Sequence, residues 1–273
     1  MGVVTYSLLA AIYIPTFYKL FTYGWRQADY SHGPLIILVF LWLMWRERGV
    51  FAIASDNRIQ PFALSVLLFG LLLYIFGSIQ RTIMLEAFSL IPVLVGTTGF
   101  LIGRDALRHI IFPAAFLIFL VPPPLFFIDM ITSPLKMMVA STSELLLRFA
   151  GYTISRNGAI LFIGDYSIVV GDTCSGLRSL ISLMAVGAIY AYLQKTSNLK
   201  RFILFLSIIP IAIAANIIRF LLLALITYYF GEAAGQGFFH NFSGILIFLM
   251  SLLSLIIVDV FILNRGSKNE NAG

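Results

Sequence analysis

Long, predominantly apolar runs constrain the fold more than any other feature of this sequence. Residues 202–223 and 245–263 each have about the length and composition of a helix that crosses a bilayer, roughly 20 apolar residues. Over the whole chain, 60% of the residues are hydrophobic and 11% are charged, whereas a soluble domain has about 25% charged residues. The alternation typical of a membrane barrel is not sustained. The sequence therefore predicts an all-α integral membrane protein.

We expect about eight transmembrane helices in one polytopic membrane domain over residues 1–273. The second and fifth are short enough for a buried or tilted helix to be an alternative. Residues 1–22 lack the basic start and the A-x-A-like end of a cleaved signal peptide, so the first span is expected to remain as an anchor. The expected spans are 3–22, 34–46, 61–78, 87–103, 109–122, 175–194, 200–229 and 242–264.

The distribution of lysine and arginine predicts the orientation. Basic residues concentrate in one set of short loops, which should be cytoplasmic. Both termini then lie on the cytoplasmic side of the cell membrane, and the long segment 122–173 lies outside as an extracytoplasmic insert. The net charge of +6 is explained by this topology, so no nucleic-acid partner is expected. The basic residues of the inner set are Arg46, Arg48, Arg58, Arg104, Arg108, Lys195, Lys200, Arg201, Arg265 and Lys268.

The insert 122–173 has its own local pattern. It opens with consecutive prolines at 122–124, which do not continue a helix. Apolar residues at helical spacing over 134–150 predict an amphipathic helix that lies in the outer interface. The run "NGAILFIGDYSIVVGD" predicts two short strands around Gly164 and Asp165, which form a small β-ribbon.

Cys174 is the only cysteine and lies in "GDTCSGLRSL", where the sixth span begins. Asp172 or Thr173 can cap that helix. The positive end of the helix dipole favours the thiolate, and Arg178 adds positive charge on the same helix face. The alternative is that Cys174 is a small buried hydrophobic residue.

Arg219 lies inside the seventh span, where an arginine is costly and indicates function. It comes 18 positions after Arg201, which at ~1.5 Å per residue raises it about 27 Å through a hydrocarbon layer about 30 Å thick. Arg219 is therefore expected near the outer surface, level with Cys174, with Asn216 on the same helix face. The alternative is an arginine that reaches lipid phosphate.

His240 lies just before the last span, in the outer loop without lysine or arginine. Histidine transfers protons near neutral pH. A thiol, a base and a cation are the parts of a cysteine acyl-transfer site, so we expect Cys174, His240 and Arg219 to meet. An interfacial histidine is the alternative. His32, also predicted outside, either lines the pocket or stabilises a helix boundary.

The remaining polar signals are weaker. Asp259, near the inner end of the last span, is expected to make a structural polar contact, with a proton path as the alternative. His109 on the inner side is expected to be only a topology residue. No spacing of metal ligands, phosphate loop or dinucleotide motif occurs, so no metal or cofactor is expected.

Three short motifs resemble those of the exosortase/archaeosortase family of membrane cysteine transpeptidases. They are "DTCSGLRSL", "NIIRF" and "FFHNFSG", and the resemblance extends through the insert and back to "YSHGPL", over most of residues 25–250. It implies that Cys174 is the nucleophile, His240 the general acid and base, and Arg219 the group that stabilises the oxyanion or thiolate. The residues expected to bind substrate or support the site are Arg178, Asn216, Asp172, Ser175 and His32.

The same resemblance implies the substrates. They are exported proteins with a C-terminal sorting signal, which consists of a short motif, a hydrophobic span and a basic cluster. The enzyme would cleave this signal at the outer membrane interface through a thioester, and water or an amine on a lipid or glycan acceptor would resolve the intermediate. Two other functions stay open: a small-solute transporter or channel in which Arg219 binds an anion, and a membrane acyltransferase that uses the same residues.

Overall fold

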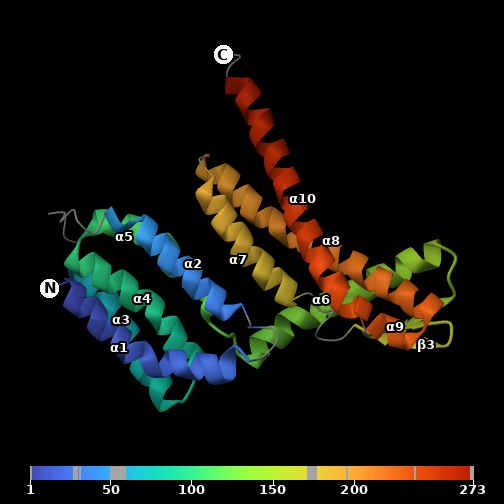
Figure 1. The fold of residues 1–273 in the computed structure, drawn as a ribbon, viewed down its shortest axis with the longest axis horizontal. Coiled ribbons are helices and arrows are strands. Elements are labelled where there is room, and N and C mark those ends of the chain that lie inside the picture. Colours follow the sequence, from blue (N-terminus) through green and yellow to red (C-terminus); the bar gives the residue numbers. More distant parts are fainter. Residues whose placement is uncertain are drawn as a thin grey trace. The chain divides into compact units, whose positions relative to one another are not determined.

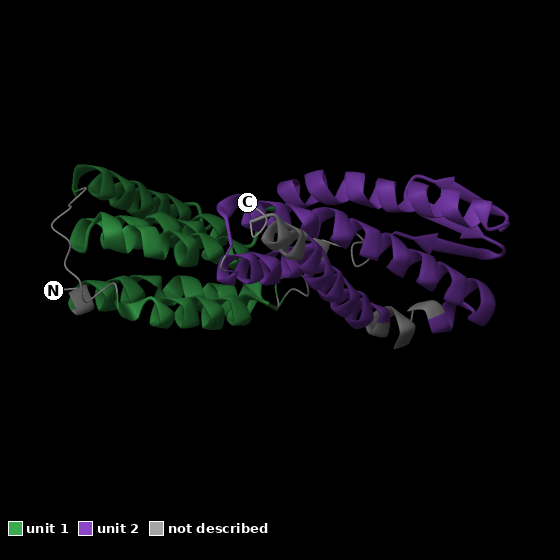
Figure 2. Ribbon diagram, turned by 90° about the horizontal axis from the view of Figure 1, so that it is seen from above, with its two compact units in different colours: residues 1–124 green, residues 125–273 purple. Residues whose placement is uncertain are grey.

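The computed structural model describes residues 2–26, 30, 32–49, 60–170, 177–194, 196–236 and 238–270. The chain divides into two compact units, residues 1–124 and 125–273 (Figure 2). Within the described ranges, five helical segments are long and apolar enough to cross a membrane, and Gly33–Arg46 and Leu180–Leu193 are shorter apolar helices. A multi-pass, mainly helical membrane protein agrees with the prediction, while the count of eight spans stays a prediction. The five long segments are Val4–Gly24, Gln60–Ile79, Ile83–Leu101, Asn198–Phe230 and Ser243–Phe261.

Unit 1 is entirely helical over its described residues (Figure 1). Close packing of α3 against α4 depends on glycine: a Cβ atom on Gly96 would lie 2.5 Å from the backbone nitrogen of Leu67. Small residues at such positions let the two backbones approach. The elements are α1 (Gly2–Lys19), η1 (Leu20–Gly24), α2 (Gly33–Arg46), α3 (Gln60–Ile79), α4 (Ile83–Leu101), α5 (Arg104–Phe116) and η4 (Leu117–Leu120).

A row of polar contacts joins α1 to α4 in antiparallel register. At one end of the row is Glu86, whose side chain is 1% exposed. Lys19 neutralises this carboxylate, because its Nζ lies 2.6 Å from Oε1. Each side chain in this row has a partner on the other helix, which offsets the cost of burying polar groups in an apolar medium. The contacts are Tyr6–Thr98 at 2.8 Å, Tyr13–Ser89 at 2.7 Å, Thr16–Glu86 at 3.0 Å and Lys19–Glu86 at 2.6 Å.

Unit 2 begins with one long helix and a small sheet, followed by further helices. The two strands predicted around Gly164 and Asp165 are present as β2 and β3. A third strand, β1, was not predicted and pairs with β2 across a turn at Gly158 with φ +62°. β1 is "ISRN", and its polar residues hide the alternation on which a strand prediction depends. The elements are α6 (Leu125–Phe149), β1 (Ile154–Asn157), β2 (Ile160–Ile163), β3 (Tyr166–Val169), α7 (Leu177–Leu193), α8 (Asn198–Phe230), α9 (Glu232–Gln236) and α10 (Phe238–Glu270).

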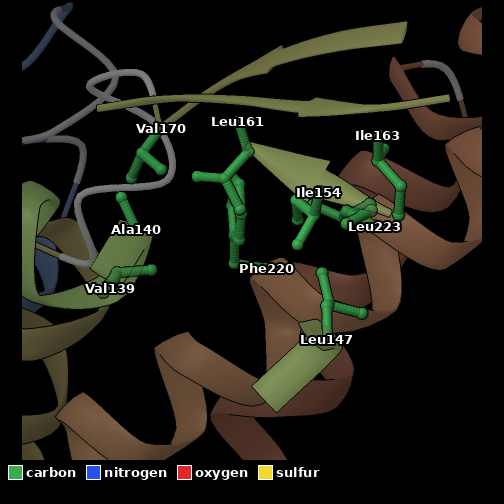
Figure 3. Packing of buried hydrophobic residues seen from close by; sticks show 10 residues of the cluster. Val139, Ala140, Leu147, Ile154, Leu161, Ile163, Val170, Phe220 and Leu223 are labelled. Carbon is green, nitrogen blue, oxygen red and sulfur yellow. The ribbon is translucent and has the colours of Figure 1, made fainter. Parts of the chain in front are cut away.

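The helix of the insert is longer than predicted. α6 begins at Leu125, directly after the prolines at 122–124, and continues through Pro134 to Phe149. The predicted start at residue 134 was therefore wrong, since the prolines end the preceding segment and Pro134 does not interrupt the helix. α6 and the sheet pack on the C-terminal half of α8, as Figure 3 shows. Their shared core contains Val139, Ala140, Leu147, Ile154, Leu161, Ile163, Val170, Phe220, Leu223 and Ala224.

α8 is long enough to serve two environments. Its 33 residues extend about 50 Å at ~1.5 Å each, which exceeds the ~30 Å hydrocarbon thickness. Lower on the helix, α8 packs with α7 and α10 around a second core, where Gly187 of α7 allows close contact with Ile208. The buried residues of this second core are Leu183, Ala191, Leu204, Ile208, Ala212 and Leu255.

Asp259 of α10 makes the structural contact expected of it. It is buried, with 5% exposure. Tyr190 of α7 and Gln194, directly after α7, donate hydrogen bonds to its Oδ2, the latter at 3.1 Å. Arg201 of α8 donates to the backbone oxygen of Gln194 at 2.7 Å. These bonds connect α7, α8 and α10 at the end where α8 begins.

Candidate active site

Arg219 of α8 is buried between helices rather than directed to lipid. Its side chain is 9% exposed, and that of Asn216, one turn earlier, is 4% exposed. The Nε of Arg219 donates a hydrogen bond to Oγ of Ser243 on α10, with a separation of 3.3 Å. This contact argues against the alternative in which Arg219 extends to lipid phosphate, because the guanidinium turns into the interface between α8 and α10.

Gly244 of α10 lies beside the same guanidinium. A Cβ atom built on Gly244 would lie 3.5 Å from Nη2 of Arg219, 3.7 Å from Cζ and 4.0 Å from Nη1. These are ordinary van der Waals distances for a methyl group, but a longer side chain in that direction would occupy the position of the guanidinium. Ser243 and Gly244 together form the part of α10 that meets Arg219.

His240 lies in the first turn of α10, which begins at Phe238. It precedes Ser243 by three residues and Gly244 by four, so the helix register puts all three on one face. The sequence placed His240 in an outer loop; the structure instead has α9 within that loop and His240 inside a helix. The side chain of His240 lies outside the described residues, so its role stays a prediction.

The predicted nucleophile segment also falls outside the described residues. Positions 171–176 include Cys174, Asp172 and Ser175, and their expected roles stay predictions. The described part of α7 begins at Leu177, so the backbone of Arg178 is in its first described turn. Because α7 packs against α8, the chain that leads out of this segment belongs to the same helix group as Arg219.

His32 belongs to unit 1 and occupies the position directly before α2, without a side-chain capping hydrogen bond. Its Nε2 lies 3.2 Å from the backbone oxygen of Phe119, in η4. This contact favours the helix-boundary interpretation of His32. A pocket-lining role for His32 stays a prediction.

A tyrosine cluster stabilises the far end of α8, beyond Arg219. The hydroxyls of Tyr152, after α6, and Tyr229, in α8, form a hydrogen bond of 2.8 Å. This bond raises the pKa of Tyr152 above its usual value of 10.0. Tyr228 packs edge-on against both rings. The cluster joins the insert to α8 and so supports the helix that carries Arg219.

Sequence reasoning missed Ser243 and Gly244 as site residues. Both stand in "FFHNFSG", but the predicted span began at residue 242, which left His240 without a helix register. Had the predicted helix begun at Phe238, its register would have placed Ser243 and Gly244 on the same face as His240. Over the described residues, no group of three or more histidine, cysteine, aspartate or glutamate side chains could hold a metal ion.

This arrangement supplies a buried cation whose hydrogen-bond partner, Ser243, lies one helical turn after His240 on α10. A family model described as transmembrane exosortase matches residues 25–257, which is most of the chain. Neither a curated protein nor a solved structure matches this chain. The match confirms the resemblance indicated by the cysteine, arginine and histidine motifs. The chain therefore belongs to the transmembrane exosortase family.

Proposed function

We propose that this exosortase is a cysteine transpeptidase that cleaves the C-terminal sorting signal of exported proteins at the outer face of the cell membrane. Family membership supports a membrane transpeptidase or sorting role, with membrane-associated protein substrates. The substrate's own hydrophobic segment would dock laterally among the spans and bring its scissile bond to the level of Arg219. In the orientation predicted from lysine and arginine, both termini lie in the cytoplasm and the insert lies outside.

The reaction begins when the thiolate of Cys174 attacks the scissile carbonyl carbon. The carbonyl oxygen becomes negatively charged, and Arg219 stabilises it, aided by backbone N–H groups at the start of α7. The C–N bond then breaks, and His240 gives its proton to the departing amine. The acyl group remains on Cys174 as a thioester. Water, or an amine on a lipid or glycan acceptor, attacks the thioester and regenerates the thiol.

One observation carries this proposal: Arg219 is buried and hydrogen-bonded to α10 within one turn of His240. Electrostatic stabilisation is strongest where water is excluded and the charged group is already in place. Asn216, buried one turn before Arg219, is positioned to support the guanidinium or the substrate. Arg178, Asp172 and Ser175 would complete the surroundings of Cys174.

The outward-facing surface of α6 is consistent with the proposed orientation. Over most of the helix this surface is apolar and exposed, which in a membrane protein indicates contact with lipid. The opposite side packs on the sheet and α8. α6 would then lie in the outer leaflet and hold the sheet at the interface. The exposed apolar residues are Phe126, Phe127, Met130, Ile131, Met137, Met138, Leu145, Leu146 and Phe149.

The decisive experiment uses purified protein in liposomes with a substrate that carries a motif, a hydrophobic span and a basic tail. Cys174→Ala and Cys174→Ser should leave the substrate uncut, because no thioester forms. The matched control is Ser254→Ala, a partly exposed position of α10 whose hydroxyl donates to the backbone oxygen of Met250, one turn earlier. Normal processing by Cys174→Ala would overturn the proposed chemistry.

Thiol labelling tests the orientation independently. Cys174 is the only cysteine, so any label reports on that residue alone. An impermeant alkylating reagent added outside intact cells should react near neutral pH, because the helix end and nearby cations favour the thiolate. Labelling only after the membrane is opened would contradict an outward-facing site.

A further inference from the structure

The contact between Arg219 and Ser243 uses one defined edge of the guanidinium. Nε is the donor, and the guanidinium is a rigid planar group with five N–H bonds in fixed directions. Once the Nε–H bond points at Ser243, rotation about the side chain is limited and the directions of the two Nη groups follow. Ser243 is itself 6% exposed, so water does not compete readily for its hydroxyl.

Gly244 contacts a different part of the same group. The distances from a Cβ on Gly244 to Nη2, Cζ and Nη1 are 3.5, 3.7 and 4.0 Å. Because Cζ–N bonds are only about 1.33 Å long, an approach in the plane between the two Nη atoms would leave both of them closer than Cζ. The observed distances instead place the Cβ above the plane, so Gly244 approaches the face of the guanidinium. The hydroxyl therefore fixes the edge of the guanidinium and the glycine sets its plane.

We propose that Ser243 and Gly244 are positioning residues that aim the guanidinium of Arg219 at the reacting carbonyl oxygen. The inference rests on the proposed function, in which Arg219 stabilises that oxygen. Both residues follow His240 within one turn of α10. The turn that carries the proton donor thus also orients the cation, and a shift of α10 would misplace both together.

The first test measures kcat and KM for Ser243→Ala, Ser243→Thr and the control Ser254→Ala. Loss of a hydrogen bond from a charged group costs roughly 1.5–3 kcal/mol, so kcat should fall about tenfold or more in Ser243→Ala. KM should change little, because the group acts on the developing charge and not on ground-state binding. Ser243→Thr keeps the hydroxyl and should restore most of the rate, while Ser254→Ala should behave as the native protein.

A background variant separates orientation from general damage. Arg219→Lys retains the charge but has no Nε–H donor or planar fork. Ser243→Ala should therefore cause no further loss of kcat in Arg219→Lys. Equal losses in the two backgrounds would overturn the proposal, and so would a native kcat in Ser243→Ala or a failure of threonine to restore it.

The Gly244 series provides a second test if Ser243→Ala folds poorly. Alanine places one methyl group at van der Waals distance and should lower kcat by no more than about threefold, whereas leucine fills the guanidinium position and should lower it about tenfold or more. Equal kcat values in folded Gly244→Ala and Gly244→Leu would contradict the inference. If Cys174→Ala or Arg219→Ala retained full activity, the proposed function itself would fail, which is a separate outcome.

Discussion

Each unit buries a charged side chain, but the two charges have different surroundings. In unit 1, Glu86 is neutralised by Lys19 and also accepts a hydrogen bond from Thr16 at 3.0 Å. In unit 2, Arg219 donates to the neutral hydroxyl of Ser243 and lies over Gly244. An ion pair cancels the field of its own members, whereas a hydroxyl orients a cation without neutralising it. The ion pair of unit 1 holds helices together, whereas in the proposed function the cation of unit 2 acts on the substrate.

The largest expected effect is on the stability of unit 1. Glu86→Leu leaves the Lys19 ammonium without its carboxylate, and breaking a buried pair costs roughly 3–5 kcal/mol. Because Lys19 is 36% exposed and its ammonium can reach water, we expect a value near the lower end, about 3 kcal/mol. Unfolding by SDS in mixed micelles, followed by circular dichroism, measures the loss.

The double variant Lys19→Met/Glu86→Leu is the matched control for that experiment. It removes both charges together, and replacing a buried pair by apolar groups is often nearly neutral. Native-like stability of the double variant would identify the pair as a structural contact. A double variant as unstable as Glu86→Leu would remove the assigned role of the ion pair.

The next effect should appear in catalysis and not in stability. Arg219→Gln removes the cation but keeps a polar side chain, and loss of one oxyanion donor lowers kcat by about 10²–10³-fold. Its stability should change by less than that of Glu86→Leu, because the Ser243 hydroxyl that it leaves behind is a neutral group and glutamine can still hydrogen-bond to it. Cleavage assays and SDS unfolding on the same preparation measure both. A large stability loss with normal turnover per folded molecule would reverse the comparison.

Two glycines give a smaller contrast in packing. A Cβ on Gly96 would lie 2.5 Å from the backbone nitrogen of Leu67, whereas on Gly187 it would lie 2.2 Å from the mobile Cδ1 of Ile208. A side-chain end can rotate away, but a helix backbone cannot. Overpacking costs about 1–3 kcal/mol, and alanine recovers about 1 kcal/mol of helix propensity. We expect Gly96→Ala to lose about 2 kcal/mol and Gly187→Ala less than about 1 kcal/mol in SDS unfolding. Equal losses would show that the two interfaces are similarly rigid.

The smallest effect concerns the tyrosine cluster. The hydrogen bond between Tyr152 and Tyr229 raises the pKa of Tyr152, so folding favours the protonated phenol. The resulting stability is fully present below a pH of about 10 and is lost as the pH rises through the raised pKa of the folded state. SDS unfolding midpoints of the native protein should therefore decline more steeply above pH 10 than those of Tyr152→Phe. Parallel pH profiles would mean that the bond does not contribute to folding.

The sequence predicted most of the helices, because hydrophobic length is a local property. It also predicted that Arg219 is a functional residue and does not contact lipid phosphate, because an arginine within an apolar span is costly. Glu86 was missed because the fourth span was placed at 87–103, which left this carboxylate at the edge. Its partner Lys19 is 67 positions away, and no local pattern reveals such a pair. The third strand was missed because the polar residues of "ISRN" hide its alternation, and the start of α10 was missed because the predicted span began only at residue 242.

The uninterrupted length of α8 has a mechanical consequence. The part of α8 that follows Pro210 is one continuous helix. It carries both Arg219 and the residues that pack against the sheet, Phe220 and Leu223. A rod cannot bend between neighbouring residues without breaking its ladder of hydrogen bonds. Any tilt of α8 therefore displaces the sheet and the guanidinium of Arg219 together, as one rigid body.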